Sequence, residues 1–173
     1  MNETIKQMAA VAPVDRISVL APKAALNGTI TGQRSLADNL KSMLASLSEG
    51  RIADFLTGFQ SPFKFTDHAL NLEFREHQQL TEFLEKAREL FPDTVMEAIS
   101  VFQSGDAAIA EWKLTATETI SAGSVNLRAP ILLSGVSIAQ FNRGKITRWT
   151  DYYDQLKSRR MGLAAFFTEW VEL

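Results

Sequence analysis

The sequence predicts an α+β fold in which helices cover one face of a curved antiparallel sheet and enclose an apolar pocket. Apolar residues recur at helical spacing up to about residue 91, and from residue 94 to residue 153 they alternate with polar residues, as in strands. The length of 173 residues is typical of one domain. A composition of 46% hydrophobic and 22% charged residues argues against a disordered or membrane-spanning chain.

The composition also limits the partners and the chemistry. The formal net charge is −2, so no strongly basic face is expected to neutralise the phosphates of a nucleic acid. The chain has no cysteine and two histidines, which leaves little for a disulfide, a thiolate nucleophile or a zinc site. Charged residues interrupt the apolar residues near the N-terminus, where no secretory signal is evident. We therefore expect a cytoplasmic protein with no metal, no nucleic-acid partner and no membrane partner.

The two ends of the chain differ from its middle. Residues 1–34 are expected to be an irregular extension, because prolines and glycines break every short apolar stretch, at Pro13, Pro22, Gly28 and Gly32. Residues 35–173 are expected to form the α+β domain. Its last part, from residue 155, returns to helical spacing and is expected to be a helical tail.

Three helices are expected before the strands. The first covers residues 35–50 and opens with a serine and an aspartate spaced as in a capping box. The second covers residues 52–59 and is stopped by Pro62. The third covers residues 77–91, with one apolar stripe for the core. Its charged residues are expected to lie away from that stripe, namely Glu82, Glu85, Lys86, Arg88 and Glu89.

Five strands are expected. The first, at residues 63–66, leads into a loop that holds Asp67 and His68. Short turns, each with a glycine, separate the other four, which are Val95–Phe102, Ala107–Glu118, Val125–Phe141 and Lys145–Tyr153. Because neighbouring residues of a strand point to opposite faces, alternate residues of a curved sheet would line its concave pocket.

The order of these elements, together with the segment Gly-Lys-Ile-Thr-Arg-Trp-Thr-Asp-Tyr-Tyr-Asp at residues 144–154, resembles the nuclear transport factor 2-like superfamily. Within it, the resemblance is closest to SnoaL-like polyketide cyclases and limonene epoxide hydrolases. In those families a hairpin glycine precedes a last strand of the form G-K-I-x-x-W-x-D-Y-x-D. The resemblance covers residues 36–154. It implies a cone-shaped α+β barrel around a pocket, with Asp151 as a catalytic acid or base.

The period of the last strand supports part of this assignment. If Trp149 faces the core, Asp151 and Tyr153 share its face, so the acid lies between two aromatic residues. Apolar surroundings disfavour the charged form of a carboxyl and raise its pKa toward the range useful for proton transfer. Spacing alone leaves open a structural aspartate that caps a turn or pairs with a lysine or arginine.

The chain departs from the epoxide hydrolases on an inner strand. Those enzymes place an arginine and an aspartate two residues apart there, working with the aspartate of the last strand. Here Trp112 and Leu114 take the inward positions, and Glu111 and Lys113 take the other face. A one-residue register shift would turn the charged pair inward, but it would expose Trp112 and Leu114. Epoxide hydrolysis is therefore the less favoured activity.

Two further residues are candidates to assist Asp151. Asp67 lies near the position where these families often hold a polar residue that orients substrate or water, and His68 is adjacent. Histidine titrates near neutral pH, although a lone histidine in a loop is more often a solvated turn residue. The residues expected to shape the pocket are Phe65, Trp112, Leu114, Leu133, Trp149 and Tyr153.

The first functional hypothesis is an enzyme that carries out acid-base chemistry, cyclisation or isomerisation, on a small apolar carbonyl-containing compound, without a cofactor. The alternative is a noncatalytic ligand-binding or dimerisation module of the same fold, because fold alone does not fix function. A homodimer is expected through apolar residues on the outer sheet face, with the aromatic tail contributing: Ile109, Val136 and Ile138, then Phe166, Phe167 and Trp170. The tail could instead close over its own pocket as a lid.

Overall fold

The structure, a computed structural model, describes residues 35–122 and 125–154. The extension predicted for residues 1–34 and the tail predicted for residues 155–173 lie outside the described residues. The described part has three helices, α1 (Leu36–Ser48), α2 (Ile52–Thr57) and α3 (His77–Leu90), and six strands, β1 (Phe59–Asp67), β2 (Leu72–Phe74), β3 (Val95–Ser104), β4 (Ala107–Ala122), β5 (Val125–Asn142) and β6 (Lys145–Tyr153). None of these helices has the length and apolar character needed to cross a membrane.

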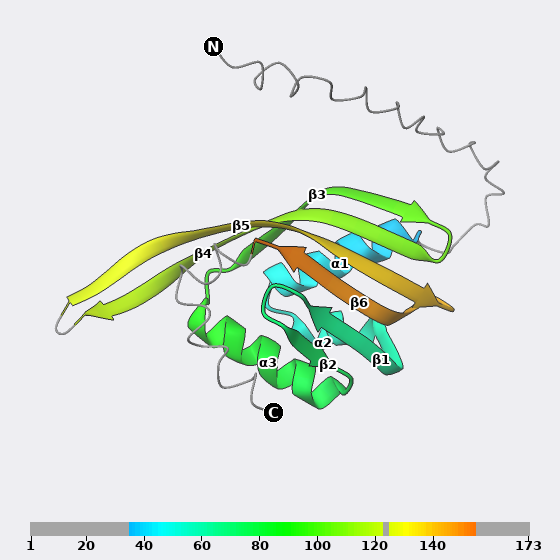
Figure 1. The fold of residues 1–173 in the computed structure, drawn as a ribbon, viewed down its shortest axis with the longest axis horizontal. Helices are drawn as coiled ribbons and strands as arrows, with labels where there is room; N and C mark the ends of the chain where they lie inside the picture. The colour runs from blue at the N-terminus through cyan, green and yellow to red at the C-terminus, as the bar shows by residue number, and fades with distance from the viewer. Residues whose placement is uncertain (1–34, 123–124, 155–173) are drawn as a thin grey trace, which may run out of the picture. The chain divides into compact units, whose positions relative to one another are not determined.

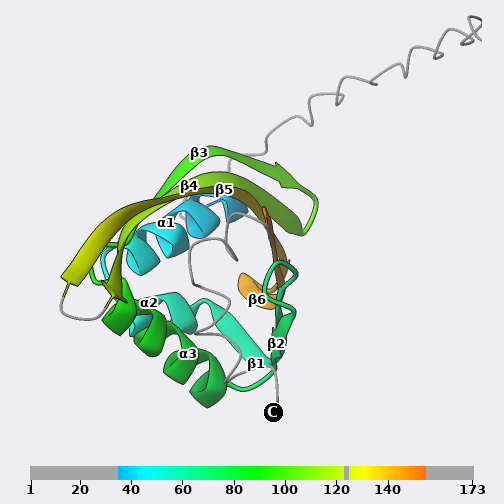
Figure 2. The ribbon, with the colours of Figure 1, turned by 60° about the vertical axis from the view of Figure 1, so that its left-hand side comes forward.

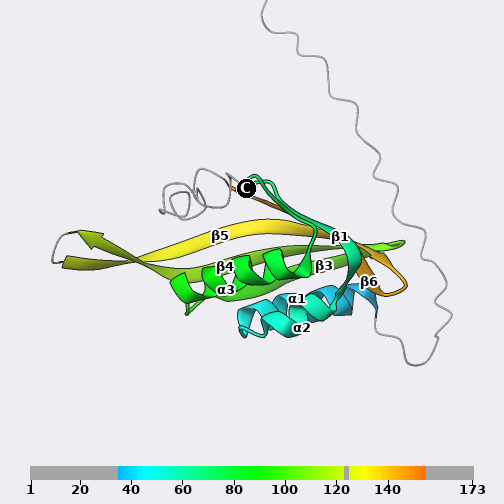
Figure 3. The same cartoon turned by 90° about the horizontal axis from the view of Figure 1, so that it is seen from below.

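The six strands form one sheet in the order β2-β1-β6-β5-β4-β3, and Figure 1 shows that this sheet is curved. The sheet ends at β2 and β3 and does not close on itself, so the predicted barrel is an open one. Figures 2 and 3 show the helices on the concave side of the sheet, which confirms the predicted α+β class. The prediction of an antiparallel sheet is wrong for one pair, because β1 and β6 run parallel. The first strand therefore lies beside the last one, although β2, α3 and the three long strands β3, β4 and β5 separate β1 from β6 in sequence.

The first helix begins as the sequence predicts. The backbone N–H of Asp38 donates to the Ser35 side-chain oxygen at 3.0 Å, and this satisfies one amide that the first turn leaves unpaired. The second helix ends two residues earlier than predicted, at Thr57, and the strand β1 begins at Phe59. The reason is pairing with β6: the Ile146 N–H donates to the Gly58 carbonyl at 2.8 Å.

The start of β1 also differs from the prediction around Pro62. This residue lies inside the strand and does not end the preceding helix. The register of β1 against β6 shifts between Phe59 and Lys64. Proline has no N–H to give to a ladder, and a break in register is where a strand tolerates it.

The strand β2 was not predicted. It has three residues, of which Leu72 and Phe74 are buried and Glu73 is exposed. Asn71, with a φ of 59°, makes the turn that brings the chain back antiparallel to β1. An alternation of only three residues is too short to be recognised in a sequence. The tight turn matters for the site, because it fixes the end of β1, where Asp67 lies.

The core lies between the helices and the concave face. Trp149 is 1% exposed, packs edge-on against Phe55 with ring centroids 5.4 Å apart, and stacks on Phe65 at 6.1 Å. On β4, the residues Ala110 and Trp112 are buried while their neighbours in sequence face solvent. This confirms the predicted inward register of Trp112 and its strand.

Candidate active site

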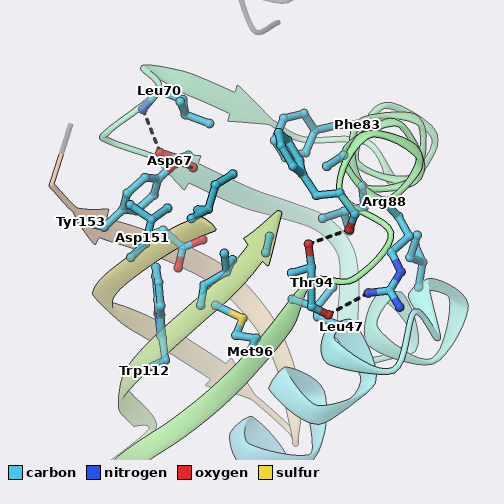
Figure 4. Close-up of a pocket in the computed structure, with 18 of the residues that line it drawn as sticks. Leu47, Asp67, Leu70, Phe83, Arg88, Thr94, Met96, Trp112, Asp151 and Tyr153 are labelled. Carbon is cyan, nitrogen blue, oxygen red and sulfur yellow. Dashed lines mark hydrogen bonds between the residues drawn. The ribbon is translucent and has the colours of Figure 1, made fainter. Parts of the chain in front are cut away.

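A pocket lies between the concave face of the sheet and the helices, with a volume of about 190 Å³ (Figure 4). Apolar side chains make up most of its wall. Helix α3 contributes Phe83, Leu84 and Ala87, and the end of α1 contributes Leu47. All the residues predicted to shape the pocket line it, namely Phe65, Trp112, Leu114, Leu133, Trp149 and Tyr153. A cavity of this size and character suits a small, mostly apolar molecule.

Asp151 lies in this pocket and is partly exposed to it. Its Oδ1 accepts two hydrogen bonds, from the Ser137 hydroxyl at 2.5 Å and from Trp149 Nε1 at 2.8 Å. Ser137 in turn accepts from Trp112 Nε1 at 2.8 Å. No hydrogen bond joins Oδ2 to any residue of the described ranges. One oxygen is thus held in place by neutral donors, and the other is available to a ligand.

Desolvation of its carboxyl raises the pKa of Asp151 to about 7, and repulsion from Asp67 contributes to the rise. The hydrogen bonds from Ser137 and Trp149 act in the other direction, because they stabilise the ionised form. A carboxyl with this pKa has substantial populations of both its protonated and its ionised form at neutral pH. It can therefore both accept and return a proton in one reaction cycle.

Asp67 is the last residue of β1 and the register partner of Asp151 on β6. Both of its oxygens are engaged: Oδ1 accepts from the Leu70 N–H at 2.9 Å and Oδ2 from the Tyr153 hydroxyl at 2.8 Å. Burial raises the pKa of Asp67, while the bonds from Leu70 and Tyr153 lower it. Burial and the nearby Asp67 raise the pKa of Tyr153, which therefore stays a neutral donor. Asp67 acts on the pocket by orienting Tyr153.

His68 does not line the pocket. Its side chain is exposed and stacks on Tyr152, with ring centroids 4.5 Å apart and an interplanar angle of 17°. Tyr152 lies between Asp151 and Tyr153 in β6, and strand alternation points it to the opposite face of the sheet. This geometry does not support His68 as a partner of Asp151.

Two residues have roles at the pocket that sequence reasoning did not assign. Ser137 is fully buried and links Trp112 to Asp151. A serine in a strand carries no pattern of its own, and only the register of β5 between β4 and β6 shows that it faces both residues. Arg88 was expected on the solvent side of α3, but it lines the pocket. It lies four residues after Leu84 and three before Phe91, both of which line the same wall.

Glu111 and Lys113 are exposed on the outer face of β4, as predicted, and Glu111 accepts from the Ser100 hydroxyl at 3.0 Å. The pocket positions on this strand belong to Trp112, Leu114 and Ala116, and none of them is an acid or a base that could polarise an epoxide. Across residues 35–122 and 125–154, no three histidine, aspartate or glutamate side chains are grouped so that they could hold a metal ion.

Comparison with known proteins identifies a family for this chain. The SnoaL-like domain matches residues 40–149. A search of curated proteins gave no match. A solved structure from Shewanella putrefaciens, provisionally named a SnoaL-like polyketide cyclase, has 12% identity and a TM-score of 0.64 over 75% of this chain and 97% of that one.

Two further solved structures have the same fold. One, from Acidithiobacillus ferrooxidans and provisionally named a polyketide cyclase, has 25% identity and a TM-score of 0.58 over 77% of this chain and 99% of that one. The other is TerC, crystallised with polyporic acid, with 16% identity and a TM-score of 0.60 over 73% of this chain and 98% of that one. The family match spans more than half of the chain, and the chain belongs to the SnoaL-like family of the nuclear transport factor 2-like superfamily.

Proposed function

We propose that this protein is an enzyme that moves a proton at a carbon atom next to a carbonyl group in a small, mostly apolar compound, and so catalyses a cyclisation or an isomerisation. The observation that carries this proposal is the arrangement of Asp151. Its Oδ1 is fixed by Ser137 and Trp149, its Oδ2 is available, and its pKa is raised to about 7 inside an apolar cavity. Active sites commonly combine a pocket with a carboxyl whose pKa is shifted from its ordinary value.

In the proposed reaction, ionised Asp151 accepts a proton from the carbon beside the carbonyl. The electrons of that C–H bond form the enolate, which either attacks a second carbonyl of the same molecule or takes a proton back at another carbon. Asp151 returns the proton to the alkoxide or to the carbon, so atoms and charge balance without a redox partner. General acid-base catalysis by a positioned carboxyl contributes roughly 10²- to 10⁴-fold in rate.

The space in the pocket separates this proposal from a purely structural role. A scaffold would fill the concave face of the sheet with its own side chains, whereas here about 190 Å³ remains between the sheet and the helices. A noncatalytic ligand-binding module would use the same cavity, but it would not need an ionisable group with an available oxygen. Relatives named as polyketide cyclases agree with a carbonyl-bearing ligand.

Proton exchange tests the proposal without knowledge of the natural substrate. The protein is incubated in D₂O with small bicyclic ketones, beginning with 2-tetralone, and NMR follows the loss of the protons next to the carbonyl. Wild type should exchange these protons faster than buffer alone does. In Asp151→Asn, the exchange rate in excess of the buffer rate should be lower by about 10²-fold or more. Asp106→Asn is the matched control, because Asp106 is exposed on the turn between β3 and β4. Equal exchange by wild type and Asp151→Asn, or no exchange by wild type with any ketone, would contradict the proposal.

A further inference from the structure

Arg88 is a cation in the wall of the pocket, on the side away from Asp151 and Tyr153 (Figure 4). It comes from the last turn of α3. Its Nη1 donates to two backbone carbonyls, that of Ser48 at 3.2 Å and that of Thr94 at 3.0 Å. Both acceptors are neutral, and within the described residues no carboxylate forms an ion pair with Arg88. The described part of the chain therefore provides no anion that balances its charge.

Contacts with the described residues hold the guanidinium in place and use only some of its donors. Only Nη1 takes part in the two hydrogen bonds to carbonyls, and an arginine side chain has five N–H groups. Gly50, with a φ of 71°, lies beside the guanidinium, and a Cβ there would come within 3.3 Å of Arg88 Nε. The remaining wall on this side has Leu47, Ile52 and Phe91, and Thr94, whose hydroxyl donates to the Phe91 carbonyl. Arginine keeps its charge, and Arg88 is half-buried, so a bound anion would offset the cost of holding this cation beside apolar groups.

The charges of the pocket are thus separated. Asp67 and Asp151 lie on β1 and β6, and Arg88 lies on α3 across an apolar middle. An anionic group would be repelled from the two carboxyls and attracted to the guanidinium, which would fix the direction in which a ligand lies. Guanidinium groups also match the geometry of a carboxylate.

From this arrangement we infer that Arg88 determines specificity by binding a carboxylate or a similar anionic oxygen of the ligand, so that the substrate is an acidic, mostly apolar carbonyl compound. This inference rests on the proposed function in that it takes the same pocket as the ligand site. It adds a substrate class: one acidic group at Arg88, an apolar body along Phe83 and Leu84, and the reacting carbon at Asp151.

A matched pair of probes tests the inference. 2-Naphthoate and 2-naphthamide have nearly the same shape, but only the first carries a charge at neutral pH. Calorimetry at pH 8 should give wild type a dissociation constant about tenfold or more lower for the naphthoate. Arg88→Gln should abolish this preference. Lys86→Gln should keep it, since Lys86 is an exposed cation of the same helix and does not line the pocket.

A second measurement needs no variant. In ¹⁵N-labelled wild type, the Arg88 Nε–H resonance should shift further at saturation with 2-naphthoate than at saturation with 2-naphthamide. This decides the matter if Arg88→Gln fails to fold, which circular dichroism would reveal. Equal affinity of wild type for both probes, no measurable binding of either, an unshifted Arg88 resonance, or a preference that persists in folded Arg88→Gln would overturn the inference.

The two proposals fail separately. If wild type keeps the preference for naphthoate but exchanges no ketone protons, the proposed reaction is rejected and the role of Arg88 stands. If wild type exchanges ketone protons but binds both probes equally, the role of Arg88 is rejected and the proposed reaction stands.

Discussion

Asp67 and Asp151 are register partners across the parallel strands β1 and β6, yet their carboxyl groups have different environments. Asp67 accepts at both oxygens, from Leu70 and Tyr153, while Asp151 accepts only at Oδ1. Asp67 also has a third donor, the Ala69 N–H, and of two neighbouring carboxyls the one with more donors keeps its charge more readily. A proton taken up by this pair near neutral pH therefore resides mainly on Asp151.

Replacing Asp151 by asparagine should stabilise the protein at high pH. Its pKa is raised from 3.8 to about 7, so between these values the folded state binds more protons than the unfolded state, and stability falls as pH rises. An amide oxygen can accept the bonds from Ser137 and Trp149. We expect a gain on the order of 1 to 3 kcal/mol in the free energy of unfolding at pH 8 that shrinks toward zero near pH 4. Urea denaturation measures it, and a difference that does not vary with pH would argue against the raised pKa.

Ser137→Ala should move the titration of Asp151 upward. The Ser137 hydroxyl stabilises the ionised carboxyl, so its loss raises the pKa of Asp151 further. The variant also leaves Trp112 Nε1 without its acceptor, at a cost of about 1 to 3 kcal/mol. The pH midpoint of ketone exchange should rise above that of wild type, and Ser134→Ala, on an exposed position of the same strand, should leave it in place. A midpoint that stays constant in Ser137→Ala would remove Ser137 from this positioning role.

Gly135→Ala should disturb the wall of the pocket at Trp112. A Cβ at this position would lie 2.5 Å from Trp112 Cζ2 and 2.7 Å from the backbone oxygen of Tyr152, so the indole must move. We expect a loss of stability of about 1 to 3 kcal/mol, as in other overpacked cores, and a changed tryptophan emission. Thermal unfolding and fluorescence measure both effects. Unchanged values for both would mean that Trp112 has more room than the structure gives it.

The outer face of the sheet carries the apolar residues on which the expectation of a homodimer rests. Phe102 and Ile109 are register partners, as are Ile109 and Ile138, so the three form one row across β3, β4 and β5. Phe102 is 64% exposed and Ile109 37%, whereas Val136 and Ile138 are half-buried. Apolar patches of this kind usually mark interfaces.

Phe102→Lys should therefore convert a dimer to a monomer in light scattering. Leu90→Lys, an exposed residue of α3, is the control that should remain dimeric. A wild-type mass that is monomeric at all micromolar concentrations would exclude the dimer.

The sequence was most informative where a pattern is long and local. The alternation of β4 and β6 predicts the pocket positions of Trp112, Trp149 and Asp151, because a strand buried on one face repeats every second residue. The α+β class with a curved sheet follows from the order of the elements.

Contacts between segments far apart in sequence could not be predicted in this way. The parallel pairing of β1 with β6 depends on how the whole domain folds, and it alone brings Asp67 beside Asp151. Ser137 faces the carboxyl only through the register of three strands. Arg88 belongs to a helix whose other charges face solvent, and its place at the edge of the apolar stripe is decided by packing.

The central claim, that Asp151 is a proton carrier poised near neutral pH, is tested most directly by a ¹³C NMR titration of its carboxyl carbon. The spectrum of Asp151→Asn identifies the resonance by its absence. The account predicts an inflection at a pKa of about 7, coinciding with the midpoint at which ketone exchange rises with pH, since the ionised form is the base. An Asp151 resonance that titrates below pH 5, like an ordinary solvated carboxyl, would contradict it.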